Sequence, residues 1–135
     1  MTGNLIMITH NQHTNPDQSE RLIKAGLPTS TADMHYRDGA YHQGKPNMNT
    51  MAVVAPIWSA LALRQLMPTY IGKGVYRHYR LGWEETQRGV VVFYVDHIWN
   101  SFTKVEFECE DLLDGYVDMT CWLLNNGYME KGGAS

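Results

Sequence analysis

The chain has few of the features that usually indicate a disulfide-bonded, membrane or catalytic protein. Its two cysteines, Cys109 and Cys121, are most simply free thiols in the core, with a single disulfide as the alternative. No segment approaches the roughly 18 consecutive apolar residues of a membrane-spanning helix. The first residues lack a basic segment, and their apolar run is shorter than a signal peptide requires. We therefore expect a cytoplasmic protein that does not associate with a membrane.

Known catalytic and metal-binding motifs are also missing. Residues 71–75, Ile-Gly-Lys-Gly-Val, resemble a phosphate loop only in part, because a P-loop has a longer motif that opens a helix. His10 and His13 have His-x-x-His spacing, but no cysteine or carboxylate motif completes a metal site. His35 and His42 flank a glycine-rich segment without a partner motif. We predict no catalytic residue, no metal site and no cofactor.

Charges of the two signs are nearly balanced. The chain has 11 Lys and Arg and 14 Asp and Glu, which gives a net charge of −3. This balance excludes a whole-protein attraction to nucleic acid or to acidic membranes, but it does not exclude a local basic patch.

The length of 135 residues predicts a single domain that spans residues 1–135. We expect residues 1–14 and 130–135 to be ragged, that is, poorly ordered. Residues 37–49 are rich in glycine, asparagine and proline, which is the composition of a loop. Since long loops in compact domains are often mobile, we expect a mobile loop at 37–49.

Three segments have the apolar spacing and the end signals of helices. The first covers residues 16–25, with Asn15 or Thr14 as its cap. The second lies within residues 56–67, with Ser59 as its cap. The third, residues 111–127, is the longest and has an acidic start, an apolar stripe and a glycine stop.

The strands are expected between the second and third helices. Residues 75–83 and 103–109 alternate between apolar and polar, and residues 90–99 are apolar on both faces. Short turns separate these segments, which predicts an antiparallel meander. We predict an α+β fold: a three- to five-stranded antiparallel meander with about three helices packed on it and a long C-terminal helix.

The central strand carries more apolar residues than one helix layer can cover. Residues 90–95 are Val-Val-Val-Phe-Tyr-Val, so both faces of this strand need a partner. The N-terminal segment, the second helix or another subunit are the alternatives. We favour a homo-oligomer.

A cluster of basic and aromatic residues on the predicted strands is the best candidate for a binding site. Such side chains stack on bases and pair with phosphates. The alternative is an exposed sheet face whose arginines pair with nearby carboxylates. The predicted ligand-binding residues are Arg77, Tyr79, Arg80, Trp83, Arg88 and Trp99.

Three motifs resemble a known group of proteins. They are Glu20–Met34, Pro56–Pro68 and Asp111–Tyr128, the last with its Trp-Leu-Leu-Asn-Asn-Gly-Tyr ending. Together they resemble small uncharacterised phage and prophage proteins of gut Bacteroidetes and relatives. The resemblance implies an accessory viral protein made inside a bacterial host cell, and it brings no catalytic residues with it.

These observations lead to a non-enzymatic binding protein as the first hypothesis. The context implied by the resemblance suggests counter-defence by sequestering a nucleotide-like signalling ligand, which is an argument by analogy. The second hypothesis is a protein–protein interaction module that inhibits a host defence protein. The third is a small phosphodiesterase or nuclease that uses His35, His42, His78 or His97.

Overall fold

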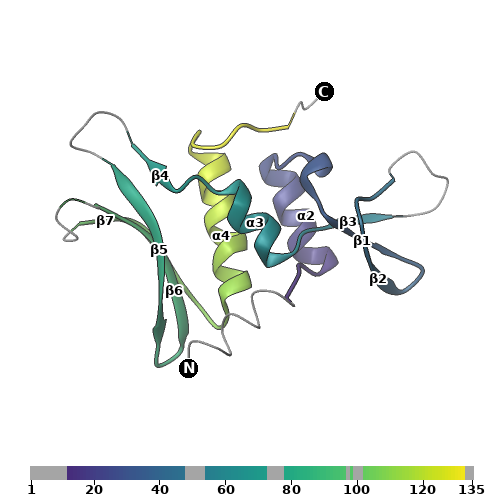
Figure 1. Cartoon of the computed structure of the whole chain (residues 1–135), viewed down its shortest axis with the longest axis horizontal. Coiled ribbons are helices and arrows are strands. Elements are labelled where there is room, and N and C mark those ends of the chain that lie inside the picture. The colour runs from purple at the N-terminus through teal and green to yellow at the C-terminus, as the bar shows by residue number, and fades with distance from the viewer. Residues whose placement is uncertain (1–11, 48–53, 73–77, 97, 99–101, 133–135) are drawn as a thin grey trace.

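The computed structural model describes residues 12–47, 54–72, 78–96, 98 and 102–132. Within these ranges the chain forms three α-helices and two antiparallel sheets (Figure 1). In chain order the elements are α2 (Pro16–Ala25), a 3-10 helix (Thr29–Thr31), β1 (Met34–Arg37), β2 (Ala40–Gln43), β3 (Ala55–Ile57), α3 (Ala60–Leu66), β4 (Tyr70–Ile71), β5 (Tyr79–Thr86), β6 (Gly89–Asp96), β7 (Thr103–Cys109) and α4 (Leu112–Asn125).

The two sheets lie at opposite ends of the molecule, with the helices between them (Figure 1). The larger sheet has the strand order β4-β5-β6-β7 and the smaller one β2-β1-β3. Helix α4 packs against β6 and β7, and α2 and α3 pack against α4. The predicted α+β fold, with an antiparallel meander and a long C-terminal helix, is confirmed.

A side-chain oxygen caps the N-terminus of each of the three helices, and Asn15 and Ser59 are among the predicted caps. Asn15 accepts a hydrogen bond from the Gln18 N–H at 2.8 Å, and the Gln18 side chain accepts one from the Asn15 N–H at 2.9 Å. This capping box satisfies two backbone donors that an uncapped helix would leave unpaired. Ser59 and Asp111 cap α3 and α4 through their side-chain oxygens. Helix α2 ends at Gly26, whose φ of 109° is left-handed.

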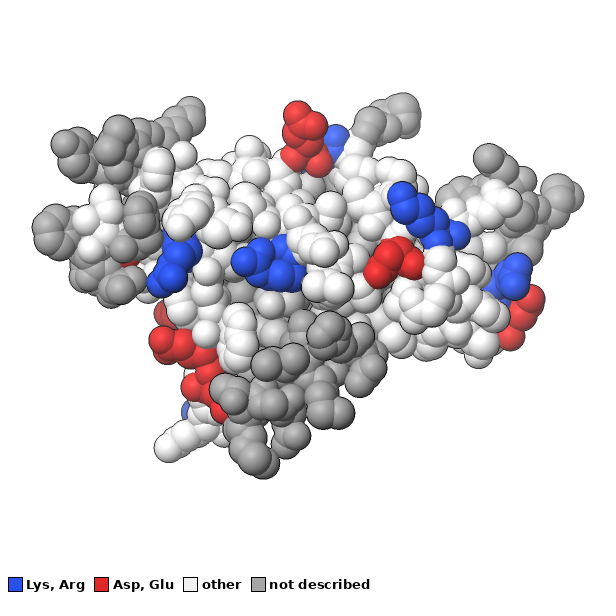
Figure 2. Space-filling model, in the orientation of Figure 1, with Lys and Arg blue, Asp and Glu red and all other residues white. Residues whose placement is uncertain are grey.

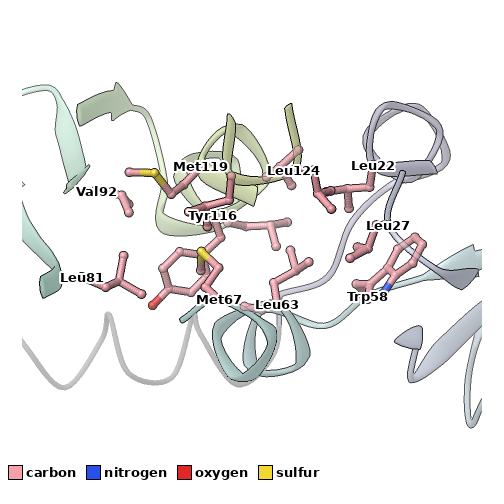
Figure 3. Packing of buried hydrophobic residues seen from close by; sticks show 14 of the residues in the cluster. Leu22, Leu27, Trp58, Leu63, Met67, Leu81, Val92, Tyr116, Met119 and Leu124 are labelled. Atoms are coloured by element: carbon pink, nitrogen blue, oxygen red, sulfur yellow. The ribbon is translucent and has the colours of Figure 1, made fainter. Parts of the chain in front are cut away.

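One hydrophobic cluster joins the larger sheet to all three helices. Figure 3 shows Leu81 and Val92 of the sheet facing Tyr116 and Met119 of α4, with side chains of α3 beside them. Trp58 is fully buried toward the smaller sheet. Each large side chain of this kind contributes about 1.5–3 kcal/mol when it leaves water, before conformational entropy is subtracted.

A glycine allows α4 to approach the sheet closely. A Cβ atom at Gly115 would lie 2.5 Å from Cγ2 of Val92, which is much shorter than a normal carbon–carbon contact. The absence of a side chain at Gly115 therefore sets the distance between α4 and β6.

The expectation that residues 37–49 form a loop is wrong for Ala40–Gln43, which form β2. This strand pairs with β1 in an antiparallel hairpin. Asp38 and Gly39, with φ values of 55° and 79°, make the turn between the strands. Positive φ at both positions is the requirement of a tight two-residue hairpin turn.

The expected ragged ends are also ordered in part. Thr14 is fully buried, donates its N–H to the Trp58 carbonyl at 2.9 Å and accepts the Trp58 N–H on its hydroxyl at 3.0 Å. At the other end Gly132 donates its N–H to the Gly26 carbonyl at 2.6 Å. These contacts tie residues 12–14 and 130–132 to the fold. Residues 1–11 and 133–135 lie outside the described residues.

Candidate binding face of the four-stranded sheet

Alternation along the strands gives the four-stranded sheet two unlike faces. Leu81, Val90, Val92 and Tyr94 are buried in the core beneath the helices, and we call their side the inner face. The opposite side, which we call the outer face, carries the alternate residues of three neighbouring strands. Its members are Arg80, Gly82 and Glu84 of β5, Val91, Phe93 and Val95 of β6, and Thr103, Glu106 and Glu108 of β7.

An apolar stripe runs along the middle of the outer face. It consists of Val91, Phe93 and Val95, which are all partly exposed. The Phe93 ring lies over Gly82, where a Cβ atom would be 2.8 Å from Cε1 of the ring. The prediction that the central strand is apolar on both faces is therefore confirmed. What covers its outer side stays a prediction.

The charged residues beside the stripe are exposed and mostly acidic. The three glutamates of the outer face and Arg80 make no ion pair with another described residue. Strand register places Glu84 and Glu108 on either side of Val91, near the β5–β6 turn, whereas Arg80 lies at the other end of the stripe. Figure 2 shows acidic side chains gathered near this turn, at the lower left of the view. The outer face is thus acidic at one end and carries one cation at the other.

The predicted ligand-binding arginines are dispersed among the described residues. Arg80 lies on the outer face, and Arg88 lies in the two-residue turn between β5 and β6. Neither forms an ion pair with another described residue. Arg77 and Trp99 lie outside the described residues.

The predicted aromatic residues lie on the other side of the sheet. Tyr79 and Trp83 alternate with Arg80 and share the inner-face pattern of Leu81. Trp83 is 36% exposed at the edge of the core, and Lys104 Nζ lies 5.8 Å from the centre of the Tyr79 ring. Arg80 and these two aromatic residues therefore do not line one surface. The ligand-binding role of the predicted set stays a prediction.

The two cysteines are free thiols, as predicted. Burial, together with a hydrogen bond to Asp118, raises the pKa of Cys109 to about 12. Burial also raises the pKa of Cys121. Both thiols therefore stay protonated near neutral pH, which is unsuitable for a nucleophilic cysteine. Asp118 also accepts a hydrogen bond from Arg21 at 2.8 Å, so its role is to join α4 to α2.

Histidine side chains gather at the smaller sheet. His35 and His42 are cross-strand neighbours, and their rings stack with centroids 5.1 Å apart. His13 lies 4.1 Å from the Tyr41 ring centre. Among the described residues, no group of three or more His, Cys, Asp or Glu side chains is arranged to hold a metal ion. The sequence separates His35 from His42 by a turn, and only the hairpin register brings them together.

Ser59, His13 and Asp33 lie close together but do not form a nucleophile with its base. The Ser59 hydroxyl donates to Asp33 at 2.5 Å and accepts the Ala62 N–H at 3.0 Å. His13 Nδ1 instead donates to the Thr14 carbonyl at 2.9 Å. The serine therefore acts as the cap of α3, without the hydrogen bond to an imidazole that activates a serine.

A polar cleft of about 480 Å³ lies where α2 and α4 begin. Asp114, on its wall, accepts a hydrogen bond from Gln18 Nε2 at 2.6 Å. Burial, reinforced by the neighbouring carboxylates of Asp111 and Asp118, raises the pKa of Asp114. Asn15, Gln18 and Asp111 already make the capping hydrogen bonds of α2 and α4. The lining residues are Gln12, His13, Asn15, Gln18, Asp111, Leu113 and Asp114.

Comparison of the chain with protein-family models, curated proteins and solved structures found no match. Among the described residues, no helix has both the length and the apolar character needed to cross a membrane.

Proposed function

We propose that the protein is a non-enzymatic binding module that docks another protein on the outer face of its four-stranded sheet. The observation that carries the proposal is the partly exposed stripe of Val91, Phe93 and Val95. The three helices of the described chain all lie on the inner side of this sheet (Figure 1). An apolar patch surrounded by charged residues is typical of a protein-binding surface.

The size of the stripe suits a docking site of moderate strength. Completing the burial of each partly exposed side chain contributes about 1 kcal/mol, at about 25 cal/mol per Å² of apolar surface. Three such side chains offset only part of the loss of translational and rotational freedom on association. The remaining free energy must come from the charged residues beside the stripe and from other contacts of the partner.

Sequestration of a nucleotide-like ligand has less support. A phosphate-bearing ligand needs arginines and stacking aromatic rings on one surface. Arg80 shares the outer face with three glutamates, whereas Tyr79 and Trp83 follow the inner-face pattern. A host defence protein as the partner agrees with the resemblance to phage proteins, and this origin stays a prediction.

Selection from a displayed library of random peptides tests the proposal. Phe93→Thr removes the central ring of the stripe and keeps a residue that suits a strand. Phe102→Thr is the matched control, because Phe102 is 57% exposed and lies outside the outer face. We expect peptides selected on the wild-type protein to bind the control equally and to lose at least about tenfold in affinity for Phe93→Thr, as for a central interface residue. Selected peptides that bind Phe93→Thr as well as the wild type would contradict the proposal, provided that circular dichroism shows a folded variant.

A further inference from the structure

We infer that the segment docked on the outer face is a cationic amphipathic helix of the partner protein. The inference rests on the proposed function and adds the chemical class of the partner. It depends on three observations: the charges beside the apolar stripe, their positions along it, and the way the inner face of the same sheet is covered.

The charges favour a cationic partner. Glu84, Glu106 and Glu108 are exposed and make no ion pair with another described residue. Arg80 is the one basic residue among the nine that define the outer face. A partner that covers the stripe must approach these carboxylates, and lysine or arginine side chains beside its own apolar residues compensate them.

A second copy of this chain fits the outer face less well. In a face-to-face dimer with its two-fold axis across the strands, Arg80 would face Glu84 of the other copy, but Glu106 would face its own counterpart. With the axis along the strands, Glu84 would face Glu108 of the other copy. Each arrangement brings carboxylates of like charge together in a desolvated interface. The predicted homo-oligomer would therefore need a different surface.

The spacing of the outer face suits a helix. Neighbouring strands are about 4.8 Å apart, so Glu84 and Glu108 lie about 10 Å from each other with Val91 between them. A helix has a diameter of about 10 Å with its side chains, so lysines on its two flanks reach both carboxylates. An extended peptide, in contrast, usually pairs with a sheet edge. Helix α4 already covers the inner side of β6 and β7, and a second helix would complete a three-layer arrangement.

The positions of the charges also give the complex a direction. Glu84 and Glu108 flank Val91, whereas Arg80 and Thr103 flank Val95. The cations of the docked helix should therefore concentrate over the Val91 end of the stripe. A paramagnetic label on the lysine-rich end of a bound peptide should broaden the resonances of Val91 more than those of Val95.

Two synthetic peptides test the inference directly. One is an amphipathic helix with a leucine stripe flanked by lysines that concentrate toward one end, and the other carries glutamates in place of those lysines. We expect the wild-type protein to bind the lysine peptide at least about tenfold more tightly than the glutamate peptide, measured by calorimetry at about 0.1 M salt, where the Debye length is about 10 Å. The double variant Glu84→Lys/Glu108→Lys should reverse this preference.

The matched control is the double variant Glu20→Lys/Glu130→Lys. It makes the same change in net charge at two exposed glutamates outside the outer face. We expect this control to bind the lysine peptide within about threefold of the wild type, because exposed charges more than a Debye length away are screened. Equal weakening by the two double variants would show non-specific attraction and overturn the inference.

The outcomes separate the inference from the proposed function. If both peptides bind equally and Phe93→Thr abolishes both, the outer face binds protein and the cationic partner is wrong. If both bind with equal strength to Phe93→Thr and to the wild type, or if neither peptide binds and no library peptide depends on Phe93, the proposed function fails together with the inference. A wild type that elutes as a dimer, and becomes a monomer on Phe93→Thr, would replace the partner helix with a second copy.

Discussion

The inner and outer faces of the four-stranded sheet share strand β6 but differ in what lies on them. Val90, Val92 and Tyr94 are at most 3% exposed beneath the helices. Val91, Phe93 and Val95 alternate with them and remain partly exposed. Residues of similar hydrophobicity therefore lie in two environments, since one set is buried in the core and the other is partly exposed.

The largest difference is expected from the same charge placed on each face. Val92→Asp would bury a carboxylate in the core, where Val92 is fully buried, and should lower the free energy of unfolding by at least about 4 kcal/mol. Val91→Asp leaves the new carboxylate near water and should cost about 1–2 kcal/mol, because aspartate suits a strand poorly and Glu84 and Glu108 lie on either side of it. Urea unfolding of both variants measures the difference. Equal losses would show that the two faces are equally buried.

The close approach of α4 to the inner face predicts that substitutions at Gly115 and Val92 have non-additive effects on stability. Gly115→Ala would place a Cβ atom 2.5 Å from Cγ2 of Val92, and overpacking of this kind costs about 1–3 kcal/mol. The higher helix propensity of alanine offsets about 1 kcal/mol of this loss. The same Gly115→Ala change should be better tolerated by about 1 kcal/mol when Val92→Ala is also present. Additive effects in urea unfolding would contradict the contact.

The partly buried thiol of Cys109 predicts a loss of stability in alkaline solution. Its pKa is raised to about 12 in the folded protein, whereas an unfolded cysteine has a pKa of about 8.5. The folded state therefore holds the proton more strongly, and its contribution is complete below about pH 8.5 and declines as pH rises toward 12. Thermal unfolding between pH 8 and 11 should show a steeper fall for the wild type than for Cys109→Ala. Because Cys109 is partly exposed, the difference in slope between the two proteins should be modest. If their melting temperatures fall in parallel with pH, the raised pKa of Cys109 is contradicted.

The smallest effect on stability is expected at the outer-face carboxylates. The double variant Glu84→Gln/Glu108→Gln should change the free energy of unfolding by less than about 0.5 kcal/mol, because both side chains are exposed and unpaired with described residues. Binding of the lysine peptide should nevertheless weaken by about fivefold or more. A large loss of stability would show that these carboxylates hold the fold together.

Much of the fold could be predicted because its signals are local. The cap residues Asn15, Ser59 and Asp111 are of types whose short side chains accept backbone N–H groups, and each stands where a helix begins. The antiparallel meander could be predicted because β5 and β7 alternate between apolar and polar residues and the strand between them, β6, is apolar throughout. These patterns are read within a few residues, without knowledge of distant parts of the chain.

The β1–β2 hairpin of the smaller sheet was missed, although one of its signals is in the sequence. Asp38-Gly39 lies between His35-Tyr36 and Tyr41-His42, and Asp-Gly is a strong signal for a two-residue hairpin turn. The surrounding glycine, asparagine and proline outweighed it in the interpretation as a loop. Pairing of β3 with β1 depends on segments about 20 residues apart in the chain, and no local pattern specifies it.

The candidate binding face could be predicted only in part. The apolar run at residues 90–95 correctly indicated that β6 is apolar on both faces. Grouping Tyr79, Arg80 and Trp83 by their closeness in sequence failed to separate the two sides of β5, although alternation requires it. The carboxylates beside the stripe come from β5 and β7, so their position depends on strand register, which composition does not give.

We propose that partners dock on the outer face, and methyl NMR spectra can detect such docking at single valine residues. Valine methyl groups of β6 report on both faces of one strand, with Val91 and Val95 outside and Val90 and Val92 inside. On addition of the lysine peptide, we expect the methyl chemical shifts of Val91 and Val95 to change and those of Val90 and Val92 to change little. Shifts confined to the inner pair, or to residues of the smaller sheet, would contradict it.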